Sequence, residues 1–298
     1  MPVAKRHQTR VPSRTVREAR SIKAQTIVTA VAKMCRAAAC DLPAGVGDAM
    51  RRAARAETSD AARHNLRCLL ENAAIARRGR IPICQDTGLA FIWAELGQDV
   101  LISGGTLQNA IDQGVRQGYR EGLLRASVLA DPLRGGNTGD NTPALVHVEL
   151  VTGRRLTLTL LPKGAGAENM SRLKMFPPSA GIKEITEFVL ETTKSSWANA
   201  CPPMVIGVGI GSNFDGAPLL AKKALLRDSG QRHKDPFYAS LERSLLKAVN
   251  ALGIGPAGLG GKTTALEVLV ETAPRHIASL PVAVNLQCHA ARKVRIVI

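Results

Sequence analysis

The sequence predicts a mixed α/β fold, with a helical N-terminal half followed by alternating strands and helices. In the first half, apolar residues recur at helical spacing, as at Leu107, Ile111 and Val115. In the second half, short apolar runs rich in β-branched residues alternate with helical stretches. Apolar residues make up 45% of the 298 residues and charged residues 21%, which is the composition of a folded globular protein.

Three helices are predicted in the first half, each from a periodic stretch with a boundary signal. Residues 21–40 carry apolar side chains at helical spacing and are followed by an Asp-Leu-Pro stop. Ser59 and Asp60 can cap a second helix, which we expect to end before Gly79. Thr106 opens the third helix.

The remaining elements are predicted from apolar runs and turn residues. Residues 145–151 and 156–161 flank a Thr-Gly turn, which predicts a β-hairpin. Further strands are indicated at 89–93, 204–210, 265–270, 282–286 and 294–298, and helices at 182–195, 215–227 and 237–252. An exposed strand at the end of the chain would promote aggregation, so we expect another part of the fold or another subunit to cover residues 294–298.

Basic residues outnumber acidic ones by 40 to 24, which gives a formal net charge of +16. Residues 1–20 hold six of the basic residues and one acidic residue, Glu18. This pattern predicts a flexible basic arm at 1–20 and one domain at 21–298. The alternatives for the arm are a contact with nucleic acid, with a membrane surface or with an acidic partner.

Composition also argues against several classes of function. No apolar run approaches the roughly 18 residues of a membrane-spanning helix, and the N-terminus lacks the apolar region of a secretory signal. Aromatic residues are only 3% of the chain, so few rings are present to stack on bases. We therefore expect a soluble, cytoplasmic protein that does not bind membranes, and the shortage of aromatic rings argues against nucleic-acid binding.

Six cysteines occur in a chain without an export signal, which argues against a disulfide scaffold. Cys35, Cys40 and Cys68 lie among helix-forming residues, so we expect reduced thiols in the core. The other three lie at the boundaries of predicted elements: Cys84 in a Cys-Gln-Asp-Thr-Gly turn, Cys201 before two prolines, and Cys288 at the end of an apolar strand.

Three thiolates from three distant segments would leave one iron of a four-iron cluster without a protein ligand. Such an open iron acts as a Lewis acid. Spacing alone leaves the alternative of three unrelated buried cysteines open.

Longer motifs carry a resemblance to a known family. The strings PICQDTG, NACPPMVIGVGIGSNF, LGIGPAGLGGKTTALEV and RHIASLPVAVNLQCHAAR occur in this order. They resemble the class I, iron–sulfur-dependent fumarate hydratases, and more narrowly their separate alpha subunit, which is similar to the N-terminal part of the single-chain enzymes. The likeness runs from about residue 21 to the end of the chain. L(+)-tartrate dehydratase alpha subunits share the cysteine motifs, whereas the stretch PKGAGAENMSRLKMFPPSAG resembles the fumarases.

The resemblance implies a [4Fe-4S] cluster held by Cys84, Cys201 and Cys288. It implies catalytic roles for Asp86, in proton transfer, and for His276. The substrate-binding residues that it implies are Gln85, Arg125, Gly164 and Gly166.

Two positions depart from the family pattern. Ala165 interrupts a glycine triplet, which narrows a close backbone approach. Leu269 stands where many relatives have histidine, so the choice of substrate could differ.

The expected function is that of a hydro-lyase subunit that hydrates fumarate reversibly to (S)-malate. An alternative is an L(+)-tartrate dehydratase or another C4 dicarboxylate hydro-lyase, and a second alternative is a cluster-bearing nucleic-acid-binding or redox-sensing protein. Because the single-chain relatives have a further C-terminal domain, the resemblance implies a beta subunit as partner and a dimer of heterodimers.

Overall fold

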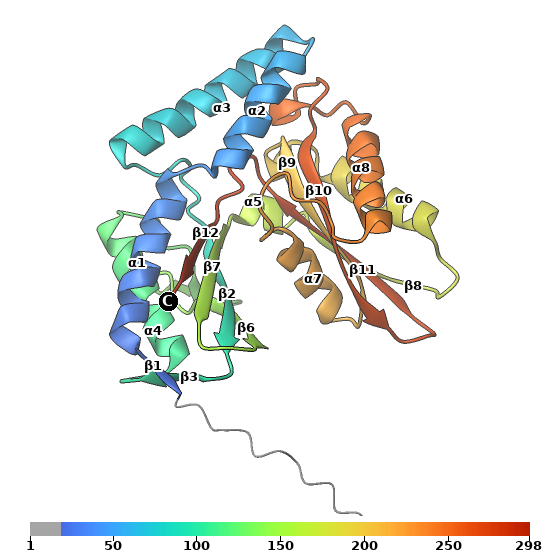
Figure 1. The fold of residues 1–298 in the computed structure, drawn as a ribbon. Helices are drawn as coiled ribbons and strands as arrows, with labels where there is room; N and C mark the ends of the chain where they lie inside the picture. Colours follow the sequence, from blue (N-terminus) through green and yellow to red (C-terminus); the bar gives the residue numbers. More distant parts are fainter. Residues whose placement is uncertain (1–18) are drawn as a thin grey trace, which may run out of the picture.

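The computed structural model describes residues 19–298, and the prediction of a mixed α/β fold is confirmed (Figure 1). Two four-stranded sheets with flanking helices form the framework. Most of the predicted basic arm lies outside the described residues. Its last residue, Arg20, begins the short strand β1 (Arg20–Lys23), which pairs with β3 (Val100–Ser103).

The first sheet has its strands in the order β12, β7, β2 and β6. Helices α1 (Ala24–Cys40) and α4 (Leu107–Glu121) pack against each other and against one face of this sheet. The bounds of its strands are β12 (Val294–Val297), β7 (Leu156–Lys163), β2 (Leu89–Gly97) and β6 (Leu145–Val151). Strand β12 pairs with β7 along one side, and Val294 and Ile296 pack against the α1–α4 cluster, so the fold covers part of this strand, which forms an edge of the sheet.

The predicted hairpin of residues 145–151 and 156–161 is wrong. Both strands form, but β2 lies between them, parallel to β6 and antiparallel to β7. Strand β2 is apolar on both faces: Ile92 is buried against α1 and α4, and Trp93 is buried on the other face. A central place in the sheet buries both faces of β2, whereas β6, at the edge, exposes Leu145 and Leu150.

The second sheet has its strands in the order β10, β9, β11 and β8. On β9 the residues Ile206, Val208 and Ile210 face helices α6 and α8, while Gly207 and Gly209 face α7. A Cβ atom at either glycine would lie 2.1 Å from a carbonyl oxygen of α7, so glycine lets this helix approach closely. The elements are β8 (Arg172–Phe176), α6 (Ile182–Ser196), β9 (Met204–Ser212), α7 (Gly216–Ala224), α8 (Pro236–Asn250), β10 (Ala265–Arg275) and β11 (Leu280–Gln287).

A third apolar cluster joins the two sheets. Helix α2 (Ala44–Ala56) contributes Val46 and Met50, which pack with side chains of both sheets. Leu269, one of the two departures from the family pattern, is buried in this cluster. Helix α2 was not predicted because two glycines weaken its helical pattern.

Predicted helix boundaries agree closely with the structure, except that residues 21–23, predicted as helix, belong to strand β1. The Ser59 hydroxyl accepts the amide of Ala62 at the start of α3 (Asp60–Gly79), and Thr106 caps α4 in the same way. The other short elements are β4 (Leu129–Asp131), β5 (Gly135–Asn137), α5 (Ala165–Glu168), η1 (Trp197–Ala200) and η2 (Pro256–Gly258). Within residues 19–298, no helix is both long and apolar enough to cross a bilayer.

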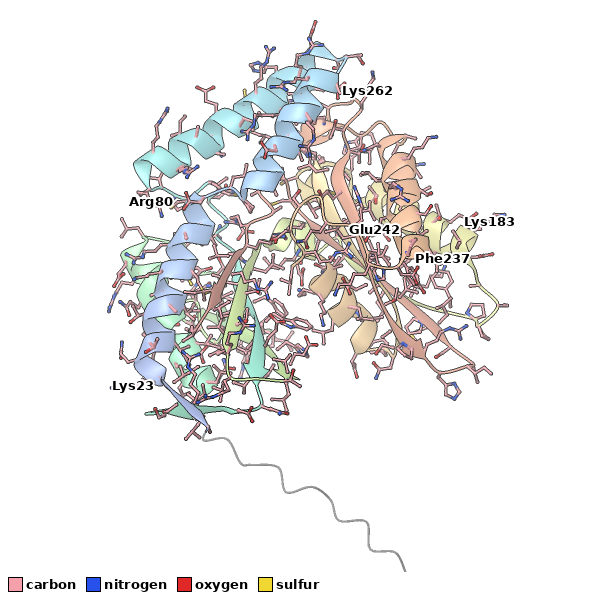
Figure 2. All side chains as sticks on the ribbon, in the orientation of Figure 1. Lys23, Arg80, Lys183, Phe237, Glu242 and Lys262 are labelled. Atoms are coloured by element: carbon pink, nitrogen blue, oxygen red, sulfur yellow. The ribbon has the colours of Figure 1, made fainter. Side chains whose placement is uncertain are left out.

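Two buried carboxylates fix the packing of the second half. Glu57, after α2, accepts the backbone amide of Lys262 at 2.8 Å and so holds a glycine-rich loop against the α2–α3 junction. Glu242 of α8, labelled in Figure 2, is fully buried. It accepts the amide of Val270 at 2.9 Å and pairs with Arg227. Each carboxylate therefore ties a helix to the β10 side of the second sheet.

Candidate active site

Two of the three boundary cysteines meet because β9 and β11 are antiparallel. Cys201 precedes β9 and Cys288 directly follows β11, and the register pairs Val205 with Gln287 at this end of the sheet. The amide of His289 donates to the carbonyl of Cys201 at 3.1 Å. Both cysteines therefore lie at the same edge of the sheet.

The turn that carries Cys84 contacts the turn after Cys288. Ile83 packs with Ala290 and Cys288 in a small apolar cluster. Burial raises the pKa of the Cys201 thiol, and negative charge on Cys288 and Cys84 raises it further. The Cys201 thiol is therefore close enough to feel the charge of each of the other two cysteines.

The chemistry of this donor set fits an iron–sulfur cluster. Among residues 19–298, no group of three or more His, Cys, Asp or Glu side chains is placed to hold one metal ion. The ligands of a cluster bind different iron atoms, so they need not converge on one point, and thiolates are the ligands that such clusters take. The role of Cys84, Cys201 and Cys288 as ligands stays a prediction.

Asp86 follows Cys84 by two residues, and its carboxylate is held by backbone amides. One oxygen accepts from Gly88 at 3.0 Å and the other from Ala165 at 2.8 Å. A Cβ atom on Gly164 would lie 3.0 Å from the second oxygen, and one on Gly166 would lie 2.9 Å from a carbonyl oxygen. A Cβ atom would therefore make a tight contact at Gly164 and at Gly166. Ala165, between them, begins α5 with an ordinary backbone conformation.

The rest of the Cys84–Gly88 turn is held by residues from distant segments. The buried hydroxyl of Tyr119 donates to the carbonyl of Gly88 at 2.8 Å, and Asn141 donates to the same oxygen at 3.2 Å. Gly88 has a φ of +82°, and its Cα faces the backbone of Lys163, so no larger residue fits. Burial raises the pKa of the Tyr119 hydroxyl, which therefore stays a hydrogen-bond donor at neutral pH.

Two of the predicted substrate-binding side chains border this turn. The hydroxyl of Thr87 donates to the carbonyl of Arg125 at 2.9 Å, and the side chain of Arg125 is exposed. Gln85 is also exposed, and its amide oxygen accepts from the Cys84 thiol at 3.2 Å. The structure therefore brings Gln85, Asp86, Arg125, Gly164 and Gly166 to the neighbourhood of the cysteines.

A buried lysine lies beneath the Cys288 turn. Lys163 is 3% exposed, donates to the carbonyl of Leu286 and pairs with Glu168 at 3.1 Å. Burial lowers the pKa of Lys163, and the nearby charges of Glu168 and Cys288 oppose that shift. Lys222 and Asn285 also contact Glu168, so this carboxylate links β7, α7 and β11.

His276 is the one predicted site residue that the structure does not bring to the cysteines. It lies in the turn between β10 and β11, whereas Cys288 lies beyond the other end of β11. The eight residues of β11 span roughly 25 Å. Within one chain, His276 therefore cannot act beside Cys288, and a catalytic role for it requires a site completed by another chain.

The expectation of core thiols holds for Cys35 and Cys40, which are buried, but is wrong for Cys68. Cys68 is exposed on α3, two residues from the buried Leu66 and hence on the opposite face of the helix. Its sulfur lies 3.4 Å from Nε2 of His64.

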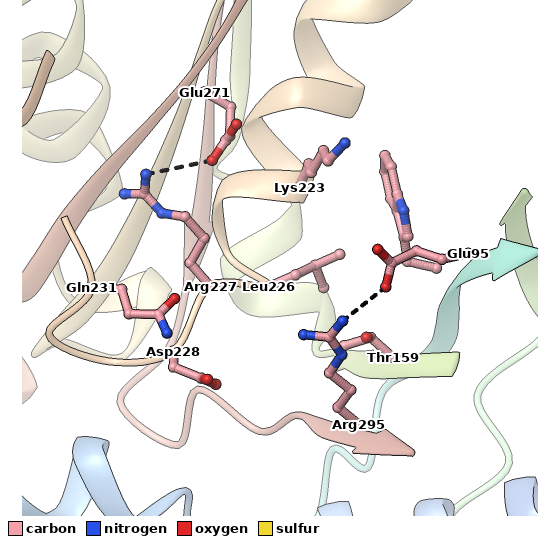
Figure 3. A pocket seen from close by; sticks show the side chains of 10 residues that line it. Glu95, Thr159, Lys223, Leu226, Arg227, Asp228, Gln231, Glu271 and Arg295 are labelled. Atoms are coloured by element: carbon pink, nitrogen blue, oxygen red, sulfur yellow. Dashed lines mark hydrogen bonds and ion pairs between the residues drawn. The ribbon is translucent and has the colours of Figure 1, made fainter. Parts of the chain in front are cut away.

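A separate cavity of about 190 Å³ lies between the two sheets (Figure 3). Its walls carry charged side chains in pairs: Arg227 with Glu271 at 3.4 Å, and Arg295 with Glu95 at 3.0 Å. None of the predicted site residues lines this cavity. Its charges are balanced, and we assign it no part in the site around the cysteines.

Several residues around the Cys84 turn were not found from the sequence. Tyr119, Asn141, Glu168 and Arg292 each lie far along the chain from the groups that they contact. Their neighbours in the sequence are mostly polar, charged or small, so no local pattern marks these four residues or indicates their partners.

Comparison with known proteins assigns the family. The model of the family described as Fumarate hydratase (Fumerase) matches residues 28–297, so the chain belongs to this family. A Methanocaldococcus jannaschii protein named "Putative L(+)-tartrate dehydratase subunit alpha" is 41% identical over 268 residues, 88% of this chain and 94% of that relative. The L(+)-tartrate dehydratase subunit alpha of Escherichia coli K12 is 32% identical over 255 residues, 85% of this chain and 84% of that relative. Family and relatives together support a hydro-lyase subunit.

Proposed function

We propose that this chain is the alpha subunit of a hydro-lyase that converts fumarate reversibly to (S)-malate with the help of a [4Fe-4S] cluster. The observation that supports the proposal is the contact among the turns that carry Cys84, Cys201 and Cys288, with Asp86 in the first of them. These turns come from segments up to about 200 residues apart. The family description supports this reaction class.

In this proposal Cys84, Cys201 and Cys288 would hold the cluster. When bound, its open iron would supply a Lewis acid for the hydroxyl that is added or removed. Asp86 lies two residues from Cys84, and two backbone amides fix both of its carboxylate oxygens. This arrangement suits a group that accepts or delivers a proton at the neighbouring substrate carbon, which typically contributes about 10²–10⁴-fold in rate.

Binding of the dicarboxylate falls to the residues around the same turn. The exposed guanidinium of Arg125 can grip one carboxylate through two parallel hydrogen bonds. Gln85 offers an amide beside it, and we assign substrate-binding roles to Gly164, which lies against the Asp86 carboxylate, and to Gly166. A second carboxylate needs a second cationic clamp, which we assign to the partner subunit.

The second candidate substrate is L(+)-tartrate. Two relatives carry tartrate dehydratase in their names. Loss of water from tartrate needs the same Lewis acid, proton acceptor and carboxylate clamps as loss of water from malate. The two substrates differ by one hydroxyl group, so the side chains that contact this group decide between them.

We further propose a beta subunit as partner, with a dimer of heterodimers as the assembly. The alpha-subunit names of the relatives and the position of His276 outside the cysteine site both support a site completed by another chain. We also propose the reducing cytoplasm as its location, because an open iron is prone to oxidation.

The test is an anaerobic activity panel with the beta subunit present. Fumarate, malate, mesaconate and both tartrates are assayed with the wild type and with Cys84→Ser, Cys201→Ser, Cys288→Ser and the matched control Cys68→Ser. We expect hydration of fumarate to be the fastest reaction and the first three variants to lose it with their iron. A faster reaction with L(+)-tartrate would select the second candidate.

Two further results would contradict the proposal as a whole. One is full activity of the three cysteine variants. The other is salt-sensitive binding of nucleic acid by a chain whose cluster spectrum does not respond to malate, which would indicate a binding or sensing protein instead.

A further inference from the structure

Arg292 is a buried cation close to the cysteine turns that the proposed function leaves without a role. Its side chain is 1% exposed, and it is among the largest fully buried side chains of residues 19–298. It follows Cys288 by four residues, beyond the end of β11. A guanidinium stays protonated under all ordinary conditions, so a full positive charge lies in the interior here.

One end of this guanidinium is bound to the turn that carries Cys84. Nη2 of Arg292 donates to the carbonyl oxygen of Asp86 at 2.8 Å. A Cβ atom on Gly164 would lie 3.0 Å from the Asp86 carboxylate and 3.9 Å from Nη2 of Arg292. Arg292 therefore joins the turn after Cys288 to the turn after Cys84. The contact lies next to Gly164, which also borders the Asp86 carboxylate.

The other end of the guanidinium lacks a partner. Nε and Nη1 of Arg292 are buried and make no hydrogen bond within residues 19–298. None of the ion pairs of the described chain includes Arg292, and Asp86 directs its carboxylate to two backbone amides instead. Burial of an unpaired charge is costly, so a nearby negative charge must offset it.

Beside the carboxylate of Asp86, whose oxygens are bound to backbone amides, the site can supply the negative charge of the three thiolates. Cys84 lies two residues before the carbonyl that Arg292 binds, Cys288 lies four residues before Arg292, and His289, between them, bonds to Cys201. We propose that Arg292 is a positioning residue: it clamps the Cys84 and Cys288 turns together and provides the buried countercharge for the cluster held by the three cysteines. This inference rests on the proposed function.

Arg292→Met and Arg292→Gln remove the charge, Arg292→Lys keeps it, and Arg295→Met removes an exposed arginine from the same segment as a control. Each full-length chain is reconstituted anaerobically, and iron content, the rate of cluster loss and the midpoint potential are measured. Melting of the unloaded chains shows which variants fold.

We expect the Met and Gln variants to lose the cluster about 10- to 100-fold faster than the wild type. Mutation of a residue that supports metal ligands from behind typically weakens metal binding by about this factor. Their midpoint potential falls, because a positive charge nearby favours the reduced cluster. We expect Arg292→Lys to keep the midpoint potential but to lose the cluster faster than the wild type, because an ammonium group lacks the planar guanidinium that reaches Asp86. Arg295→Met should match the wild type in both measurements.

Folded Met and Gln variants with the iron content, retention and potential of the wild type would overturn this inference alone. Should neither neutral variant fold, an Arg292→Lys chain with a lowered potential would overturn it instead, and one with an unchanged potential would support it. A wild type that takes up no iron would overturn the proposed function, and this inference with it.

Discussion

The carboxylate of Asp86 shows how single residues set the geometry of the site. It is aimed by the amides of Gly88 and Ala165, and the absence of a side chain on Gly164 leaves it room. A methyl group on Gly164 would press within 3.0 Å of one oxygen, so the carboxylate or the loop must move by a few tenths of an ångström.

Gly164→Ala therefore tests the role of Asp86 at the residue scale. We expect kcat/KM for the hydro-lyase reaction to fall about tenfold or more, because small displacements of a catalytic group are costly, while the melting temperature changes little. The control is Ala165→Gly, which removes a methyl group one residue along. Equal activity of Gly164→Ala and the wild type would show that catalysis does not depend on a fixed position of the Asp86 carboxylate oxygen next to Gly164.

Glu168 gives the site a dependence on pH. Burial opposes its ionisation, but the charges of Lys163 and Lys222 outweigh this effect and lower the pKa of Glu168 from 4.5 to about 2. A carboxyl group with a lowered pKa in the folded state stabilises the fold above its unfolded pKa, and this contribution is lost as the pH falls from about 4.5 towards 2.

Removal of this carboxylate should flatten the acid side of the stability curve. We expect the melting temperature of the wild type to fall more steeply between pH 5 and pH 3 than that of Glu168→Gln. Glu71→Gln, at an exposed position on α3, serves as the control and should follow the wild type. Identical slopes for Glu168→Gln and the wild type would contradict this role of the Lys163–Glu168 pair.

At the scale of elements, close contact between α1 and α4 depends on a glycine. A Cβ atom at Gly118 of α4 would lie 2.8 Å from the carbonyl oxygen of Ala32 and 2.8 Å from Cβ of Cys35. Gly47 of α2 is a helical glycine with room, since its Cβ would meet no atom closer than 3.6 Å.

The two glycines should respond in opposite directions to alanine. We expect Gly118→Ala to lower the free energy of unfolding by about 1–3 kcal/mol through overpacking. Gly47→Ala should raise it by about 0.5–1 kcal/mol, because alanine is the better helix former. Urea denaturation of both variants measures the difference, and a neutral or stabilising Gly118→Ala would show that α4 does not pack on α1 as described.

Elements were predictable where their signals are local. Ser59 and Thr106 cap the helices that they were expected to cap, because a cap and its amide lie within three residues. The pairing of strands was not predictable in the same way. The Thr-Gly turn favoured a hairpin, but the insertion of β2 between β6 and β7 is decided by burial across the whole sheet.

At the scale of the whole molecule, the candidate site depends on contacts between distant segments. The motifs identified Cys84, Cys201 and Cys288 in the sequence, and the antiparallel pairing of β9 and β11 accounts for the meeting of the last two. The bond of Arg292 to Asp86 spans 206 positions, so no sequence window could indicate it. Likewise, only the fold shows that His276 lies beyond the far end of β11.

The central claim is that three thiolates hold a cluster with one iron open to substrate. The most direct measurement is a ⁵⁷Fe Mössbauer spectrum of the anaerobically reconstituted chain with its beta subunit, before and after addition of malate. We expect the signal of one iron in four to change on addition of malate, while the other three stay constant. A spectrum in which the signals of all four irons stay the same after addition of malate would contradict the claim. A wild-type chain that takes up no cluster would contradict it as well.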